Sequence, residues 1–177
     1  MNYLEIYRQN VKALKAPEGF IFELINHNHN INILKWRNDP TINTYFHDRS
    51  EYTVEKQRKF LDHYEEFDRI DLVMIDIKNG LPVGVFSIKN LSIRPELGKM
   101  LGEKDYRGKG LAKMASFYLL QFGFNFFQFE NIVAETRKDN IGNIQLNEKL
   151  GFEIINIKLE NEEKYYIMKV NKRDLKY

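Results

Sequence analysis

The spacing of apolar residues along the chain predicts short helices and strands that follow one another closely. Apolar positions three and four residues apart indicate helices, and brief apolar runs between turn residues indicate strands. Helices are expected over residues 1–15, 31–36, 54–67, 112–127 and 140–150. Strands are expected over residues 20–25, 72–77, 83–88, 96–102, 131–136, 152–158 and 165–170. The helix over residues 112–127 is apolar on more than one side, so we expect it to be largely buried.

The alternation of strands and helices indicates one domain of the α/β or α+β class. A chain of 177 residues has room for one sizeable core, whereas two full domains would each be cramped. The sequence contains no internal repeat, low-complexity tract or linker that would divide it. We therefore expect a single domain over residues 1–177, with its core in residues 20–170.

Composition and charge exclude several classes of protein. Hydrophobic residues make up 43% of the chain and aromatic residues 14%, which is typical of a folded soluble protein. The 27 basic and 25 acidic residues are too balanced for a nucleic-acid or membrane-surface partner. The absence of cysteine excludes disulfides and a cysteinyl enzyme intermediate. With neither a secretory signal nor a membrane-spanning apolar stretch in the sequence, we expect a cytoplasmic protein.

A glycine-rich segment, Arg107-Gly108-Lys109-Gly110, lies between the strand expected over residues 96–102 and the long helix. Glycines let backbone N–H groups approach a ligand closely, and the N-terminus of a helix favours anions. The spacing fits neither a Walker loop nor a Rossmann fingerprint, which disfavours ATP and NAD. By itself the segment leaves two interpretations open, a structural turn and a phosphate or pyrophosphate site.

Several motifs in a fixed order resemble those of the Gcn5-related N-acetyltransferase (GNAT) superfamily. They are Glu96-Leu97-Gly98 with the strand that follows, the segment from Tyr106 to Ala112, Asn140, and Gly151-Phe152. Arg107, Gly110 and Ala112 meet the superfamily's pyrophosphate-loop pattern in a shifted register. The resemblance implies an acetyl-CoA-dependent N-acetyltransferase with a mixed, strongly twisted sheet that is flanked by helices. It also implies that the sheet is splayed at the cofactor site, between residues 96–102 and 131–136.

The resemblance further implies which residues hold acetyl-CoA, the expected cosubstrate. The pantetheine arm would enter the splay and pair with the main chain of Lys99, Met100 and Leu101, as an added strand does. Asn140 would hydrogen-bond the arm, and Asn147 would lie near the thiolate. The pyrophosphate would be bound by Arg107, Gly108, Lys109, Gly110, Leu111 and Ala112.

Acetyl transfer by direct attack of an amine needs a base for the nucleophile and an acid for the departing thiolate. Glu96 is the first candidate base, acting through water, and Glu135 is the second; the alternative for Glu96 is a solvated glutamate at a strand end. Many superfamily members have a tyrosine acid where this chain has Asn147, whose amide supplies no proton at neutral pH. Tyr106 or Tyr118 is then the candidate acid, or the thiolate leaves without one.

The stretch Trp36-Arg37-Asn38, followed by Tyr45 and His47, is similar to a segment of enzymes that acetylate amino sugars on nucleotide carriers. Aromatic and basic side chains of this kind stack on rings and pair with phosphates. These five residues are the candidate substrate contacts. The alternative is that Trp36 packs in the core while Arg37 forms a local ion pair.

The expected acceptor is a small-molecule primary amine, first of all a nucleotide-linked amino sugar used in surface polysaccharide synthesis. Two alternatives stay open, a ribosomal-protein N-terminus and a non-catalytic acetyl-CoA-binding module. Superfamily members often dimerise, so the resemblance adds a homodimer to the expected partners. No metal site is expected, because His27 and His29 lack a third ligand at suitable spacing and are expected to be solvated.

Overall fold

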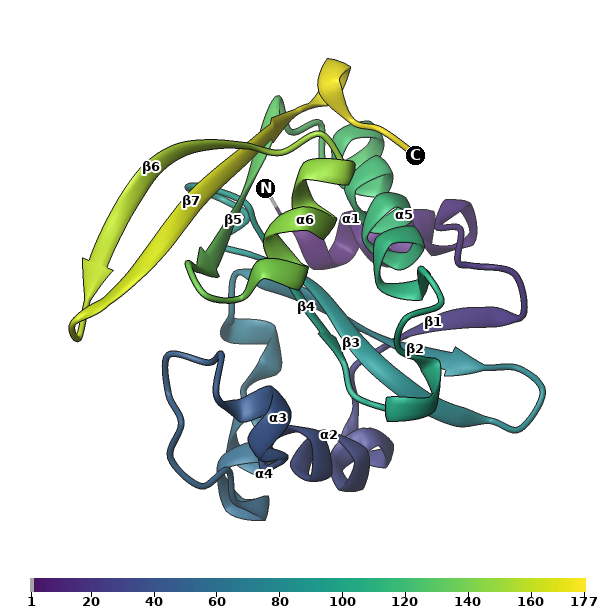
Figure 1. Ribbon diagram of the computed structural model, residues 1–177. Helices are drawn as coiled ribbons and strands as arrows, with labels where there is room; N and C mark the ends of the chain where they lie inside the picture. The colour runs from purple at the N-terminus through teal and green to yellow at the C-terminus, as the bar shows by residue number, and fades with distance from the viewer. Residues whose placement is uncertain (1) are drawn as a thin grey trace.

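The computed structural model describes residues 2–177 as a seven-stranded sheet with helices on both faces (Figure 1). The strands lie in the order β1-β2-β3-β4-β5-β7-β6. Their bounds are β1 Phe20–Leu24, β2 Arg69–Asp76, β3 Leu81–Lys89, β4 Glu96–Leu101, β5 Asn131–Arg137, β6 Glu153–Glu160 and β7 Glu163–Asn171. Neighbouring strands are antiparallel except β4 and β5, which run parallel. The predicted α/β class with a mixed sheet is confirmed.

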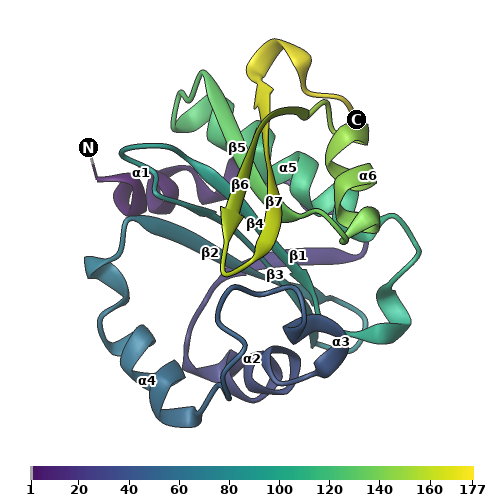
Figure 2. The same ribbon diagram turned by 60° about the vertical axis from the view of Figure 1, so that its left-hand side comes forward.

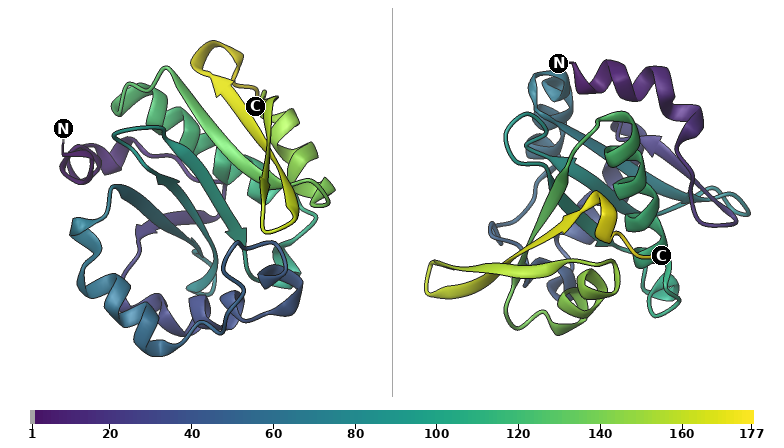
Figure 3. Two further views of the ribbon diagram at one scale, coloured as in Figure 1. Left: turned by 90° about the vertical axis from the view of Figure 1, so that its left-hand side faces the viewer. Right: turned by 90° about the horizontal axis from the view of Figure 1, so that it is seen from above.

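The helices divide between the two faces of the sheet (Figures 1 and 3). One face is covered by α1 Tyr3–Asn10, α5 Leu111–Phe126 and α6 Ile141–Lys149, and the other by α2 Asn30–Arg37, α3 Pro40–Asn43 and α4 Val54–Asp62. The first helix ends before the predicted residue 15, because the Asn10 side chain bonds back to the Ile6 carbonyl and the chain tightens into a 3-10 turn. None of the helices within residues 2–177 has the length and apolarity needed to cross a bilayer.

Two hydrophobic cores lie on opposite faces of the sheet. Strand β2 contributes to both, since Leu72 and Met74 belong to the larger core under α5, and Val73 and Ile75 belong to the smaller one under α2 and α4. This is the alternation that a strand buried on both faces requires. The hairpin formed by β6 and β7 extends past the body of the molecule in Figures 1 and 3, and it lies in front of the sheet in Figure 2.

The parallel strands β4 and β5 pair only near their starts. Within the described residues, Glu96 and Val133 form the one aligned pair, and the Val133 N–H donates to the Pro95 carbonyl at 2.9 Å. Beyond this point the strands diverge toward Leu101 and Arg137. The splay therefore lies between the two segments in which it was predicted.

The end of β4 is fixed against helix α2 by a very close contact. A Cβ atom at Gly102 would lie 2.1 Å from the ring of Trp36, so only glycine fits there. Trp36 is 1% exposed, and its Nε1 donates to Glu103 at 2.8 Å. The indole thus sets the path of the chain as it leaves the strand.

We expect Gly102→Ala to lower the free energy of unfolding by about 1–3 kcal/mol, because the added methyl group overpacks the Trp36 ring. Gly142→Ala is the matched control, since a Cβ atom there meets nothing within 4 Å. Urea unfolding at one pH measures both variants. A Gly102→Ala protein as stable as the wild type would contradict the close contact.

Candidate active site

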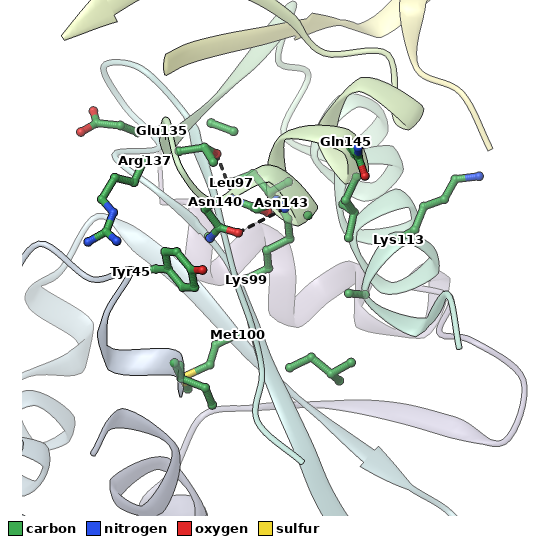
Figure 4. Close-up of a pocket in the computed structure, with 18 of the residues that line it drawn as sticks. Tyr45, Leu97, Lys99, Met100, Lys113, Glu135, Arg137, Asn140, Asn143 and Gln145 are labelled. Carbon is green, nitrogen blue, oxygen red and sulfur yellow. Dashed lines mark hydrogen bonds between the residues drawn. The ribbon is translucent and has the colours of Figure 1, made fainter. Parts of the chain in front are cut away.

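A cavity of about 690 Å³ opens where β4 and β5 diverge (Figure 4). Its walls come from both strands, the glycine segment, helix α6 and residues 41–47. Ligand sites typically measure about 300–1,000 Å³. Segments that are distant in the sequence therefore meet at a space large enough for a small-molecule ligand.

The glycine segment forms one end of the cavity. Gly108 and Gly110 adopt φ values of +74° and +75°, which favour glycine. In the part of the chain that the structure describes, no side chain caps the start of α5 at Gly110, so its first N–H groups stay available to a ligand. Leu111 and Ala112 also line the cavity. These residues fit a pyrophosphate held at a helix N-terminus.

The two basic residues of the segment act differently from the prediction. Arg107 lines the cavity, but its Nε and Nη2 donate to the carbonyls of Leu101 and Gly102 at 3.2 and 2.9 Å. The ammonium of Lys109 lies 5.8 Å from the centre of the Tyr106 ring, and Lys109 is not among the described residues that line the cavity. The structure thus places the Lys109 side chain away from the cavity, and the backbone N–H groups at the start of α5 are the groups of this segment that stay available to an anion.

Lys99 lines the cavity on the face of β4 that turns toward α5 and α6. Its Nζ donates to Oδ1 of Asn147 at 2.6 Å, and the Asn147 amide donates to Oγ1 of Thr136 at 3.2 Å. Desolvation by burial lowers the pKa of Lys99 to about 7. Asn147 is fully buried behind this lysine and is not among the described residues that line the cavity, so the structure places it away from the expected cofactor path.

The residues expected to meet the pantetheine arm do line the cavity. Lys99, Met100 and Leu101 do so from β4, and Asn140 does so from the start of α6 (Figure 4). The Asn140 side chain also caps the helix, accepting from the Asn143 N–H at 3.3 Å. One side of the arm's expected path is thus a strand and the other a helix start.

The opposite face of the two strands carries two carboxylates that line the cavity, Glu96 and Glu135. Glu96 lies 2.8 Å from Nζ of Lys89. Glu135 is 3.1 Å from both Nε2 of His47 and Nζ of Lys158, and its side chain is 8% exposed. Either carboxylate can accept a proton or hold a cationic amine.

The loop over residues 44–50 forms the wall of the cavity beside these carboxylates. Tyr45 and His47 line the cavity, as does Tyr165 of β7, on whose ring His47 stacks with centroids 4.4 Å apart. The Arg137 guanidinium donates to the Thr44 carbonyl at 2.5 Å. The loop is therefore anchored to β5 and β7.

The other expected substrate contacts lie away from the cavity. Trp36 is buried in the smaller core, and the Arg37 guanidinium lies 4.5 Å from the centre of the Tyr52 ring. The Asn38 side chain bonds both the N–H and the carbonyl of Tyr52. The structure therefore places Trp36, Arg37 and Asn38 away from the cavity, and for Trp36 the alternative of a core position is observed. These three residues instead fix the chain on either side of the loop over residues 44–50, which we call the cavity loop.

Neither candidate tyrosine acid lies at the cavity. Tyr106 donates its hydroxyl proton to Asp76 at 2.7 Å, and this hydrogen bond raises the pKa of Tyr106. Tyr118 packs beside the rings of Phe117 and Tyr177. Because the 3-10 turn before the glycine segment directs Tyr106 toward β2, its prediction as the acid is wrong.

The histidines expected to be solvated differ from each other. His27 is half-exposed, whereas His29 is buried, with Nδ1 accepting from the Asn26 N–H at 3.2 Å. Elsewhere, His47, Glu135 and Glu160 each offer an atom that could bind a metal ion, and these atoms lie within 4.8 Å of one another. The Lys158 ammonium lies beside the carboxylates of Glu160 and Glu135, and its hydrogen bonds to them raise the pKa of Lys158. The Lys158 side chain therefore supplies a positive charge within this cluster.

Arg137 and Tyr165 are among the cavity residues that sequence reasoning missed, and it assigned a role there only to the main chain of Lys99. Arg137 shares a strand face with Glu135 because the two are separated by one residue, and this alternation can be recognised in the sequence. Tyr165 pairs with Arg137 across β5 and β7, and no local pattern reveals that register.

Comparisons with known proteins agree with the geometry. A family model described as an acetyltransferase (GNAT) domain matches residues 20–153. The search of curated proteins finds no match. Spermidine N-acetyltransferase from Vibrio cholerae, solved with CoA and spermine, is 15% identical with a TM-score of 0.79, over 88% of this chain and 97% of that one.

Two further solved structures share the fold. The ribosomal-protein-S5-alanine acetyltransferase from Vibrio fischeri is 20% identical with a TM-score of 0.74, over 90% of this chain and 97% of that one. The aminoglycoside acetyltransferase AAC(6')-Ib, in complex with coenzyme A, is 18% identical with a TM-score of 0.74, over 88% of this chain and 96% of that one.

The family model spans β1 through α6 and so includes the splay and the glycine segment. The cavity, the unpaired strand edges and the helix start together fit acetyl-CoA as cosubstrate. The protein is accordingly an acetyl-CoA-dependent N-acetyltransferase, and the chain belongs to the acetyltransferase (GNAT) family.

Proposed function

We propose that the acceptor is the primary amine of an amino sugar, with a nucleotide-linked amino sugar as the first substrate class. The observation that carries this proposal is the acceptor side of the cavity, where rings of Tyr45, His47 and Tyr165 meet the carboxylates of Glu96 and Glu135. Aromatic rings pack against the apolar faces of a sugar, and carboxylates hold its amine and hydroxyl groups.

The anchoring of the cavity loop supports a small acceptor over a peptide. Besides the bond from Arg137 to Thr44, Arg49 pairs with Glu163 on β7. The Arg49 guanidinium keeps the pKa of Glu163 below its ordinary value. A loop tied down at both ends walls off the acceptor side, whereas a ribosomal-protein N-terminus would need an open groove.

Two of the structures that share the fold act on small amines by name. Aminoglycosides are themselves amino sugars, and spermidine is a small polyamine. Both molecules carry amines, as the proposed amino-sugar acceptor does. These relatives support the small-molecule acceptor, while the ribosomal-protein acetyltransferase keeps the peptide alternative in the test.

We propose direct transfer with Glu96 as the general base. The amine nitrogen attacks the thioester carbonyl carbon, the bond to sulfur breaks, and the amine proton passes through water to Glu96. The position of Glu96 at the closed end of the splay, where it is aligned with Val133, supports this role. Glu135, next to His47, is then placed to hold the acceptor in position.

Thiol-release kinetics on a panel of acceptors tests the substrate class. The panel holds amino-sugar nucleotides, the corresponding free amino sugars, an aminoglycoside, spermidine and a ribosomal-protein N-terminal peptide. We expect the highest kcat/KM with the amino-sugar nucleotides. A preference for the peptide would contradict the proposal, and acetyl-CoA binding without thiol release on any acceptor would identify a non-catalytic module.

Glu96→Gln tests the base. We expect kcat to fall by about 10²–10⁴-fold, the usual contribution of a general base, with an unchanged KM for acetyl-CoA. Glu135→Gln should instead raise the KM of the acceptor, and Glu18→Gln, at an exposed position outside the cavity, is the control. Wild-type turnover by Glu96→Gln would show that Glu96 is not the base.

A further inference from the structure

The residues assigned so far leave the departing sulfur without a proton donor. Along β4, Leu97 and Leu101 pack with the larger core and Met100 with the smaller one. Lys99 therefore projects on the α5 and α6 side of the splay, while Glu96 projects on the acceptor side. Lys99 lies between the closed end of the splay and the glycine segment that fits the pyrophosphate.

The Lys99 ammonium is held by a buried relay of polar groups. Asn147 accepts its hydrogen bond at 2.6 Å, and the Asn147 amide donates to Thr136 at 3.2 Å and to the sulfur of Met168 at 3.6 Å. The amide is thus oriented with its oxygen toward Lys99. An ammonium carries three N–H donors, and Asn147 uses one of them. The remaining donors belong to a side chain that lines the cavity.

We propose that Lys99 is the catalytic acid, which protonates the departing thiolate of coenzyme A from the face opposite Glu96. This inference rests on the proposed function only in that thioester transfer takes place in this cavity. As the bond between carbon and sulfur breaks, its electron pair goes to sulfur and a proton moves from Lys99 to give the thiol. The neutral lysine then regains a proton from solvent and protonated Glu96 releases one, so each turnover restores the starting state.

The surroundings of Lys99 favour proton release near neutral pH. Strand β3 presents the buried Phe86 beside it, and β5 presents Ala134 and Thr136, none of which carries a charge. The charged residues that line this part of the cavity are Lys113 on α5, Lys149 on α6 and Arg107. The charged and titratable residues that line the opposite side include Glu96, Glu135, Lys89, Arg137 and His47. Burial lowers the pKa of Lys99 to about 7, so the acid form is present below that pH and is lost above it.

The ionisation of bound coenzyme A tests the contact without any acceptor. The probe is the ultraviolet difference absorbance of the thiolate, measured against pH in complexes with coenzyme A and with desulfo-coenzyme A. We expect the thiolate of the wild-type complex to form at lower pH than that of Lys99→Met, because the ammonium stabilises the anion. Lys12→Met, an exposed position outside the cavity, should behave as the wild type. Identical titrations of wild type and Lys99→Met would overturn the proposal.

Steady-state kinetics tests the proton transfer itself. Lys99→Met should lower kcat by about 10²–10⁴-fold and remove the fall in rate at high pH, with an unchanged Kd for coenzyme A by calorimetry. Asn147→Asp, which leaves Lys99 in place, should move that fall to higher pH, because a carboxylate beside the ammonium raises its pKa.

The two proposals fail in different ways. The role of Lys99 would be overturned if Lys99→Met turned over at the wild-type rate. It would also be overturned if the rate of Asn147→Asp fell at the same high pH as that of the wild type. Absence of thiol release by the wild type on every acceptor would overturn the proposed function, while the thiolate titration would still decide whether Lys99 faces the sulfur. Circular dichroism verifies the fold of each variant, and Lys99→Gln replaces Lys99→Met if the latter does not fold.

Discussion

The single aligned pair between β4 and β5 is the feature on which the rest of the site depends. Glu96 and Val133 join the two parts of the sheet, and beyond them the facing edges of the two strands separate. Each strand keeps a full ladder on its other edge, β4 with β3 and β5 with β7. The opening therefore lies between two hydrogen-bonded halves of one sheet. Its unpaired main-chain groups suit an extended ligand.

The same divergence separates the chemistry of the two faces. Side chains alternate along a strand, so neighbouring residues of β4 point into different halves of the cavity. Glu96 and Glu135 face the half closed by the loop over residues 44–50, and Lys99 faces the half closed by α5 and α6. In the proposed mechanism, the group that accepts a proton and the group that donates one therefore lie on opposite strand faces and do not pair with each other.

Local patterns allowed the elements of the fold to be predicted, whereas the expected cofactor contacts came from the resemblance of several motifs to the GNAT superfamily. Hydrophobic periodicity located the strands, and the spacing of Gly108 and Gly110 located the helix start. The acceptor end was predicted only in part, because its shape depends on contacts between residues that are distant in the sequence. Trp36 is fixed by Gly102, and Tyr106 is drawn to Asp76, so neither side chain reaches the cavity that its motif implied. Asn147 gave no sign that its partner is a lysine on β4.

The stretch of α2 that contains Trp36 does not reach the cavity, but it still bears on function because it connects the glycine segment with the loop over residues 44–50. Trp36 and Lys35 both donate to Glu103, which precedes the glycine segment. Burial opposes ionisation of Glu103, but these hydrogen bonds outweigh it and keep the pKa of Glu103 below its ordinary value. A charged anchor of this kind fixes helix α2 to the chain that leads into the pyrophosphate loop. Since α2 also leads through α3 into the loop over residues 44–50, one segment connects the two ends of the cavity. A motif shared with related enzymes can therefore serve to position the reactants without contacting either of them.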